Sequence, residues 1–224
     1  MPDDKQTAAA AGPRYIVVEG PIGVGKTSLA KRLAQSYSSE LLLEGAEQNP
    51  FLEGFYRNRR FAALPTQLFF LLQRARQIEE LRQDDMFSPV RVADFLLEKD
   101  RLFAELTLDA NELQLYTQVA ESLALDPPKP DLVVYLQAPA QVLQKRIAMR
   151  GLDYEQYIDT AYLERLGEAY ARFFYDYDES PLLIVNASQI DPINREADYQ
   201  ALLETIGRIK RGRHFFNAAV EALG

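Results

Sequence analysis

Length, composition and charge limit what this chain can be. Its 224 residues are 47% hydrophobic and 26% charged, which is typical of a soluble globular protein with one sizeable core. A net charge of −8 argues against a broad nucleic-acid surface, and the absence of cysteine excludes disulfides and thiolate metal sites. No apolar run approaches the ~20 residues of a membrane span and the N-terminus has no secretory core, so we expect a cytoplasmic protein.

Predicted strands and helices alternate along the chain. The strands are expected at 14–19, 41–44, 89–94, 130–136 and 182–186, and the helices at 28–37, 65–83, 96–106, 112–125, 141–150, 162–175 and 196–211. The strands are nearly continuous apolar runs, which indicates a parallel sheet covered by helices on both faces. We therefore predict a flexible tail over 1–13 and one α/β domain over 14–224, with a five-stranded parallel sheet in a three-layer α/β/α arrangement.

Residues 20–27, Gly-Pro-Ile-Gly-Val-Gly-Lys-Thr, match the phosphate-binding loop pattern and stand between a predicted strand and a predicted helix, the context that this motif requires. The glycines let backbone N–H groups point at phosphate oxygens, and the helix N-terminus adds partial positive charge. We expect Lys26 to neutralise the β- and γ-phosphates and Thr27 to place its hydroxyl on Mg²⁺. The predicted ATP-binding residues are Gly20, Pro21, Ile22, Gly23, Val24, Gly25, Lys26, Thr27 and Ser28.

A phosphate loop identifies what is bound and not what is done with it, so three classes of protein compete. A GTPase should carry an Asn-Lys-x-Asp-type tetrad after a later strand, but the strand at 130–136 is followed by Gln-Ala-Pro-Ala. An ATPase that drives motion or assembly usually closes its third strand with an Asp-Glu pair, and here the sequence is Ala-Asp-Phe. A small-molecule kinase needs an arginine-bearing lid, and Arg146 and Arg150 lie one turn apart on a predicted helix that Gly151 follows.

Ordered landmarks from about Tyr15 to Asn186 resemble the deoxynucleoside kinase family, which includes the deoxycytidine, deoxyguanosine and deoxyadenosine kinases. The tract 43–56, Leu-Glu-(x)4-Asn-Pro-Phe-Leu-(x)2-Phe-Tyr, resembles the family's acid after strand two and the Phe-Tyr that follows it. The tract 67–74 begins with Gln and ends with Arg, two turns along one helix face, and resembles the family's base-reading helix. The tract 94–101, Asp-Phe-Leu-Leu-Glu-Lys-Asp-Arg, resembles the region of the family's Glu/Asp-Arg-Ser motif.

The resemblance implies a role for each matching residue. Glu44 is the expected general base for the 5′-hydroxyl, Tyr56 and Glu155 are expected at the sugar 3′-hydroxyl, and Asp94 is expected to hold the metal directly or through water. The predicted catalytic residues are Lys26, Glu44, Asp94, Arg146 and Arg150, the metal ligands are Thr27 and Asp94, and the substrate-binding residues are Glu44, Tyr56, Gln67, Arg74, Asp100 and Glu155. A structural ion pair between Arg74 and Asp100 and a core role for Tyr56 are the alternatives.

Two positions depart from the family pattern. Phe95 and Leu96 stand where the family commonly has Arg-Ser, so a positive charge near the phosphates is missing or comes from Arg57 or Arg101. Leu152 stands where a further lid arginine is often found. These departures suggest a divergent bacterial-type branch.

The resulting interpretation is a Mg²⁺-dependent kinase that transfers the γ-phosphoryl of ATP to the 5′-hydroxyl of a deoxynucleoside in nucleotide salvage. A purine or cytosine base is favoured, with deoxyadenosine as the first candidate. The main rival is a nucleoside monophosphate kinase of the thymidylate kinase type, which would need a basic cluster such as Arg57, Arg59 and Arg60 for the acceptor's phosphate. A switch that binds nucleotide without transfer is the other alternative, and the helices at 65–83 and 112–125 are expected to pack a homodimer.

Overall fold

The computed structural model describes residues 13–83 and 90–216 and shows an α/β fold built on one sheet. The strands are β1 (Tyr15–Glu19), β2 (Glu40–Leu42), β3 (Arg91–Ala93), β4 (Leu132–Gln137), β5 (Leu182–Asn186) and β6 (Arg213–Phe216). They lie in the order β2-β3-β1-β4-β5-β6, and every neighbouring pair is parallel. The tail predicted for 1–13 falls, apart from Pro13, outside the described residues.

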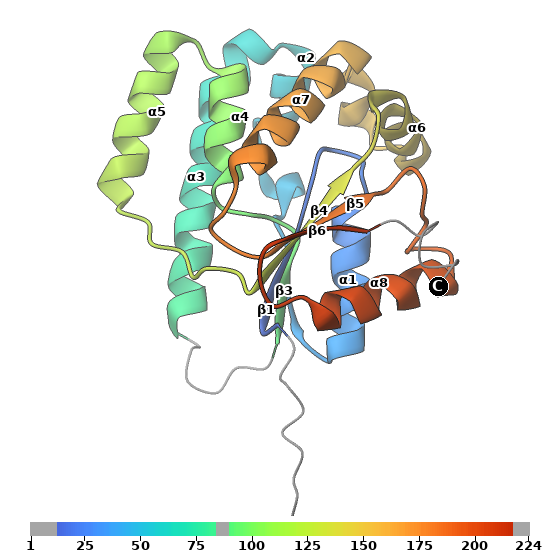
Figure 1. Ribbon diagram of the computed structural model, residues 1–224. Coiled ribbons are helices and arrows are strands. Elements are labelled where there is room, and N and C mark those ends of the chain that lie inside the picture. The colour runs from blue at the N-terminus through green and yellow to red at the C-terminus, as the bar shows by residue number, and fades with distance from the viewer. Residues whose placement is uncertain (1–12, 84–89, 217–224) are drawn as a thin grey trace, which may run out of the picture.

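Helices connect the strands and cover both faces of the sheet (Figure 1). They are α1 (Lys26–Tyr37), α2 (Leu52–Arg57), α3 (Arg59–Gln83), α4 (Lys99–Thr107), α5 (Ala110–Leu123), α6 (Ala140–Arg150), α7 (Thr160–Asp176) and α8 (Glu196–Arg208), with short 3-10 turns η1 (Ala46–Gln48) and η2 (Asp153–Tyr157). Figure 1 shows α1 and α8 together on one side of the sheet and α4 and α7 on the other. Within the two described ranges, no helix combines the length and the apolar composition that crossing a membrane requires.

Across residues 13–83 and 90–216 the sheet has six strands, so the prediction of five was wrong by one. The additional strand, β6, runs parallel to β5 at the edge of the sheet. Its residues Arg213, His214 and Phe215 are exposed and only Phe216 is buried. An edge strand with one buried side chain lacks the apolar run by which the other strands are recognised.

Helix α3 begins at Arg59 and runs through Pro65, where the sequence predicted its start. A proline inside a helix removes one backbone donor, and the helix continues where contacts hold the preceding turn. Here the guanidinium of Arg59 is 3.2 Å from Asp159 and lies 4.1 Å from the ring centre of Tyr162. These contacts hold the first turn of α3 against the start of α7. The helix therefore begins at Arg59 and not at Pro65 as predicted.

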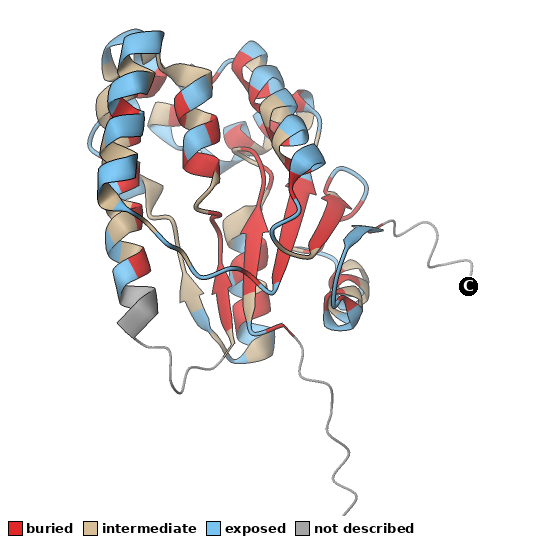
Figure 2. Ribbon diagram, turned by 60° about the vertical axis from the view of Figure 1, so that its left-hand side comes forward, coloured by how far each residue is buried: buried red, intermediate tan, exposed pale blue. Residues whose placement is uncertain are grey.

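The central strands form the buried core, as Figure 2 shows. Ile16, Val17 and Val18 of β1 are fully buried, and so are Val133 and Val134 of the neighbouring β4. This burial explains the continuous apolar runs, because both faces of a central parallel strand contact helices.

The phosphate-binding loop is tight where β1 delivers the chain into it. Gly20 has a φ of 150°, and a Cβ built there would lie 2.3 Å from the backbone oxygen of Leu136 on β4. Gly23 has a φ of 81°, and its Cβ would lie 2.7 Å from the side chain of Ile147 on α6. These positions accept only glycine, because the backbone conformation and the close approach both exclude a side chain.

Candidate active site

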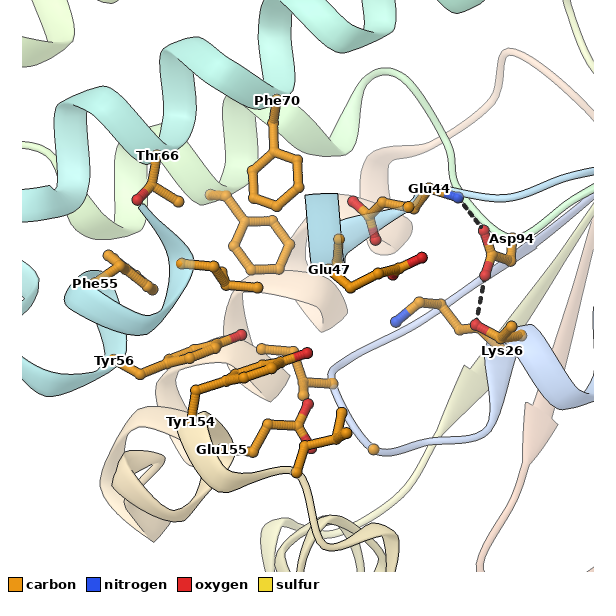
Figure 3. Close-up of a pocket in the computed structure, with 18 of the residues that line it drawn as sticks. Lys26, Glu44, Glu47, Phe55, Tyr56, Thr66, Phe70, Asp94, Tyr154 and Glu155 are labelled. Atoms are coloured by element: carbon orange, nitrogen blue, oxygen red, sulfur yellow. Dashed lines mark hydrogen bonds between the residues drawn. The ribbon is translucent and has the colours of Figure 1, made fainter. Parts of the chain in front are cut away.

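Three acidic residues stand at the carboxyl ends of neighbouring parallel strands. Glu19 ends β1, Asp94 directly follows β3, and Glu44 follows shortly after β2. In open α/β sheets this edge is where ligands bind. A cavity of about 290 Å³ opens here (Figure 3), and its lining includes Ile22, Gly23, Lys26, Thr27, Glu44, Tyr56, Gln67, Asp94, Asp100, Arg150 and Glu155.

Lys26 lies at the phosphate-loop end of this cavity. Its ammonium donates to the backbone oxygens of Gly20 at 2.7 Å and Pro21 at 3.3 Å. Burial lowers the pKa of Lys26 and Lys99 lowers it further, against the opposing charges of nearby carboxylates. The ammonium is thus folded onto its own loop, in a desolvated position where a phosphate oxygen would be a stronger partner than two carbonyls.

Thr27 and Asp94 form a hydroxyl–carboxylate pair beside Lys26. The Thr27 hydroxyl donates to Asp94 Oδ2 at 2.5 Å, and the other oxygen, Oδ1, accepts the backbone N–H of Glu44 at 2.7 Å, as the dashed lines of Figure 3 show. Asp94 therefore ties the phosphate-binding loop to the segment after β2. The pair presents hard oxygen atoms of the kind that Mg²⁺ prefers.

The carboxylate of Glu44 lies between two buried cations. Its Oε1 is 2.5 Å from the guanidinium of Arg74 on α3 and 2.9 Å from the ammonium of Lys99 on α4. Burial by itself would raise the pKa of Glu44, but Lys99, Arg74 and Lys26 lower it to about 2. The carboxylate is therefore ionised at neutral pH and accepts hydrogen bonds.

Arg74, predicted to bind the substrate, is completely buried and is not among the residues that line the cavity, so it acts on the site through its neighbours. Besides Glu44, its guanidinium bonds the Gln77 side chain at 2.8 Å, lies 3.9 Å from the ring centre of Phe95, and approaches Asp100 at 3.5 Å. Within the described residues, neither Arg74 Nε nor Asp100 Oδ2 has a hydrogen-bond partner. The two groups are close enough for charge attraction, and both keep hydrogen-bonding capacity.

Burial raises the pKa of Asp100 to about 6, although Arg74 and Lys99 pull it down. Glu44 and Glu19 contribute to the rise. Gln67, which also lines the cavity, donates to the Thr107 hydroxyl at 3.3 Å. Donor and acceptor groups thus line this end of the cavity, where a polar flat ligand edge would satisfy them.

Aromatic and acidic side chains form the wall opposite α3. The rings of Tyr56 on α2 and Tyr154 on η2 are parallel, with centres 6.2 Å apart. Glu155 is buried and accepts from Arg150 Nε at 2.9 Å. Figure 3 shows Tyr56, Tyr154 and Glu155 side by side at the cavity.

The two predicted lid arginines, Arg146 and Arg150, differ in their relation to this cavity. Arg150 lines the cavity, whereas Arg146 donates to the backbone oxygens of Val24 at 2.9 Å and Ala187 at 2.7 Å. Both arginines line a second cavity of about 450 Å³, whose other lining residues include Gly23, Val24, Gly25, Ser28, Ala187, Ile190, Asp191 and Asn194. It connects the phosphate-binding loop to the loop after β5.

Comparison with known proteins decides the family. The family model described as deoxynucleoside kinase matches residues 16–210. The chain belongs to the deoxynucleoside kinase family. It is 34% identical over 196 residues to the deoxyguanosine kinase of Bacillus subtilis, covering 84% of this chain and 93% of that protein, and 30% identical over 207 residues to the deoxyadenosine kinase of Lactobacillus acidophilus, covering 85% and 94%.

A solved structure of deoxyadenosine kinase from M. mycoides with products dCMP and dCDP has the same fold, with a TM-score of 0.76 at 22% identity over 87% of this chain and 100% of that one. As a member of the family, this chain is an ATP-dependent deoxynucleoside kinase, and the thymidylate kinase alternative is not favoured.

The basic side chains considered for the missing positive charge lie elsewhere in this deoxynucleoside kinase. Arg57 pairs with Glu53 at 2.7 Å and Arg101 pairs with Glu105 at 2.8 Å, and both guanidinium side chains are exposed. The hypothesis that one of them serves the phosphate site is wrong, because neither lines the cavity. The buried cations beside Glu44 are Arg74 and Lys99.

The basic cluster that a monophosphate kinase would need does not form at the cavity either. Arg57, Arg59 and Arg60 are absent from its lining, and Arg59 is held by Asp159 and Tyr162. The acceptor end carries carboxylates and tyrosines instead, which disfavours a phosphate on the acceptor.

Sequence reasoning missed Glu19, Lys99 and Tyr154. Glu19 is fully buried and accepts from the backbone N–H groups of Gly20 at 2.8 Å and Leu96 at 2.6 Å and from the Tyr170 hydroxyl at 2.9 Å. A charged residue at the end of an apolar strand was the available signal for Glu19. Lys99 gave none, because the run Glu-Lys-Asp-Arg at 98–101 has the composition of a solvated helix start.

Proposed function

We propose that this cavity binds a purine or cytosine deoxynucleoside and that the γ-phosphoryl of ATP is transferred to its 5′-hydroxyl. The observation that carries the proposal is the position of Glu44, an ionised carboxylate that lines the same cavity as Lys26 of the phosphate-binding loop and as Gln67 and Asp100. A hydroxyl that donates to Glu44 would face the phosphate-binding loop, while the base would reach the polar far end.

The residues would act mainly by placement and charge. Phosphoryl transfer passes through a loose transition state, so neutralised charge and in-line alignment supply most of the acceleration. Lys26, Lys31 and Arg150 are among the cations that line the cavity, and of these Lys26 and Arg150 are the proposed catalytic groups. With a pKa lowered to about 2, Glu44 is a weak base, and its main effect is to orient the 5′-hydroxyl before it takes the proton late in the transfer.

The residues present fit a magnesium ion. The described part of the chain contains no group of three or more acidic, histidine or cysteine side chains that would hold a metal alone. Magnesium in kinase sites is held by one or two protein oxygens and completed by phosphates and water, which suits the Thr27 hydroxyl and the Asp94 carboxylate. Thr27 and Asp94 would hold Mg²⁺, which when bound would supply positive charge against the negative charge that develops on the transferred group.

The base-binding end favours a base with an exocyclic amino group. Asp100 supplies an acceptor and the Gln67 amide supplies an acceptor and a donor, while Arg74 lies behind them and holds Asp100, so an amino group beside a ring acceptor satisfies the set. Adenine, guanine and cytosine have such a group and thymine lacks one. Deoxyadenosine stays the first candidate. Deoxyguanosine is the second, because a deoxyguanosine kinase and a deoxyadenosine kinase are similar to this chain at 34% and 30% identity.

Tyr56 and Glu155 are proposed for the sugar 3′-hydroxyl, and the stacked Tyr56–Tyr154 pair supports this because it gives the acceptor cavity a flat wall. The second cavity, along Ala187 to Asn194, is proposed for the donor base. We also propose a homodimer in the cytoplasm. The half-exposed Leu72 on α3 and Leu115 on α5 support the dimer, as apolar side chains available at these helix surfaces.

An ATP-coupled assay with the four deoxynucleosides and their monophosphates tests the function. Phosphorylation of a deoxynucleoside is expected, and Glu44→Gln should lower kcat by about 10²- to 10⁴-fold, because a positioned proton acceptor contributes that much. Glu53→Gln is the matched control, since Glu53 is an exposed acid paired with Arg57 on α2. Undiminished activity in Glu44→Gln would remove the assigned base, and phosphorylation of monophosphates alone would restore the rival function.

A further inference from the structure

Lys99 is the first residue of α4, and its side chain is only 3% exposed. An ammonium group is rarely buried unless anionic partners compensate its lost hydration. The nearest acid oxygens are Glu44 Oε1 at 2.9 Å and Glu19 Oε2 at 3.7 Å. Burial alone would lower the pKa of Lys99, but these two carboxylates raise it, so the side chain carries its charge.

Glu19 is satisfied without Lys99. Both of its oxygens accept short hydrogen bonds, from Gly20 N–H and the Tyr170 hydroxyl on one side and from Leu96 N–H on the other. The closer contact of the ammonium is with Glu44. Neutralising Glu19 therefore does not account for the direction in which the Lys99 side chain points.

The contact selects one oxygen of Glu44. Arg74 and Lys99 both reach Oε1, and among the described residues no hydrogen bond to Oε2 is formed. Two cations on one oxygen leave the other free to accept from a ligand and fix the plane of the carboxylate. Arg74 approaches from α3 and Lys99 from α4, so loss of either cation lets the group rotate toward the remaining one.

We propose that Lys99 is a positioning residue for phosphoryl transfer, which holds Glu44 by Oε1 so that Oε2 meets the acceptor hydroxyl. The inference rests on the proposed role of Glu44 and adds a residue that acts through it. Without Lys99, the carboxylate swings toward Arg74 and away from the phosphate-binding loop. A displacement of this kind lowers the rate of transfer more than the affinity for the deoxynucleoside, because the base and the sugar keep their own contacts.

The test is a kinetic double-mutant cycle with Glu44→Gln and Lys99→Met. We expect Lys99→Met to lower kcat by about 10²-fold, the effect of misplacing a catalytic group by roughly 1 Å, with the deoxynucleoside KM changed by less than about threefold. The double variant should have the kcat of Glu44→Gln alone within about twofold, since Lys99 has nothing to position once the carboxylate is gone. Lys99→Arg should recover most of the rate.

Arg91→Met is the matched control. Arg91 is also a buried cation paired with an acid, Glu40 at 3.3 Å, but it lies at the opposite end of β3 from Asp94. This variant should lose stability and keep its kcat. Thermal unfolding of every variant shows which of them fold. If Lys99→Met does not fold, Lys99→Gln takes its place in the cycle and is compared with Lys99→Arg.

The outcomes separate the two proposals. A wild-type chain inactive on every deoxynucleoside, or full activity in Glu44→Gln, overturns the proposed function. If the wild type is active and Glu44→Gln is impaired, two results overturn the positioning role of Lys99. One is an unchanged kcat in Lys99→Met, and the other is a double variant whose fold-loss in kcat equals the product of the two single losses.

Discussion

Replacing Arg74 by methionine removes the cation on which two acidic side chains depend. Arg74 is fully buried, lies 2.5 Å from Glu44 and 3.5 Å from Asp100, and packs on the ring of Phe95. Methionine preserves most of the packing but leaves Asp100 without its guanidinium partner. Breaking a buried pair from one side costs about 3–5 kcal/mol, so we expect Arg74→Met to lower the free energy of unfolding by that amount at pH 7.5.

The loss should shrink as the pH falls. The pKa of Asp100 is raised to about 6 in the folded protein with Arg74 present, and removal of Arg74 raises it further. A raised acid pKa means that the folded state binds more protons than the unfolded state, so protonation stabilises the fold as the pH drops through that range. At pH 5.5 the carboxyl is largely neutral, and most of the penalty due to Asp100 disappears.

Urea unfolding of wild type, Arg74→Met and Arg74→Met/Asp100→Asn at pH 7.5 and 5.5, at one protein concentration, measures these terms. The double variant should regain at least about half of the loss at pH 7.5, because it carries a neutral amide where the unpaired charge would be. A single variant that loses less than about 1 kcal/mol would refute the reasoning, since loss of a buried partner is far costlier. So would a double variant that recovers nothing.

Two further predictions concern the base end of the cavity and the phosphate-binding loop. The deoxynucleoside KM should rise several-fold as the pH falls below about 6, because burial raises the pKa of Asp100 to about 6 and protonation removes its capacity to accept a hydrogen bond from the base. Steady-state kinetics across this pH range measure the rise, and Asp100→Asn should not show it. Gly20→Ala should abolish ATP binding or folding, since its Cβ would meet the backbone of β4 at 2.3 Å. Gly167→Ala on α7 is the control and should retain binding by calorimetry, because its Cβ would have nothing within 4 Å and its φ is not positive.

The sequence by itself determined the phosphate-binding loop and the fold class. Gly20, Gly23, Lys26 and Thr27 act through backbone conformation and through the helix that follows directly, so all the determinants lie within one short stretch. The four inner strands, β3, β1, β4 and β5, were predictable for a related reason, because burial on both faces requires apolar residues at successive positions. The lone buried residue of β6 carries no such local pattern.

The resemblance located Glu44, Arg74 and Asp100, but only the tertiary structure decided how they pair. Their contacts join segments after β2, on α3 and on α4, which are adjacent because the sheet order places β2, β3 and β1 side by side. An ion pair between residues this far apart in the chain leaves no periodic signal in the sequence.

Arg57, Arg101 and Lys99 show that the sequence does not tell which charged side chains become buried. Sequence reasoning assigned the missing charge to Arg57 or Arg101, which lie on exposed helix faces and pair with acids one turn away. Lys99, in an equally charged stretch, is buried because α4 starts directly above the carboxyl ends of β1 and β3. Residue type sets which charges a chain carries, whereas packing decides which of them lose water and become strong enough to orient a reacting group.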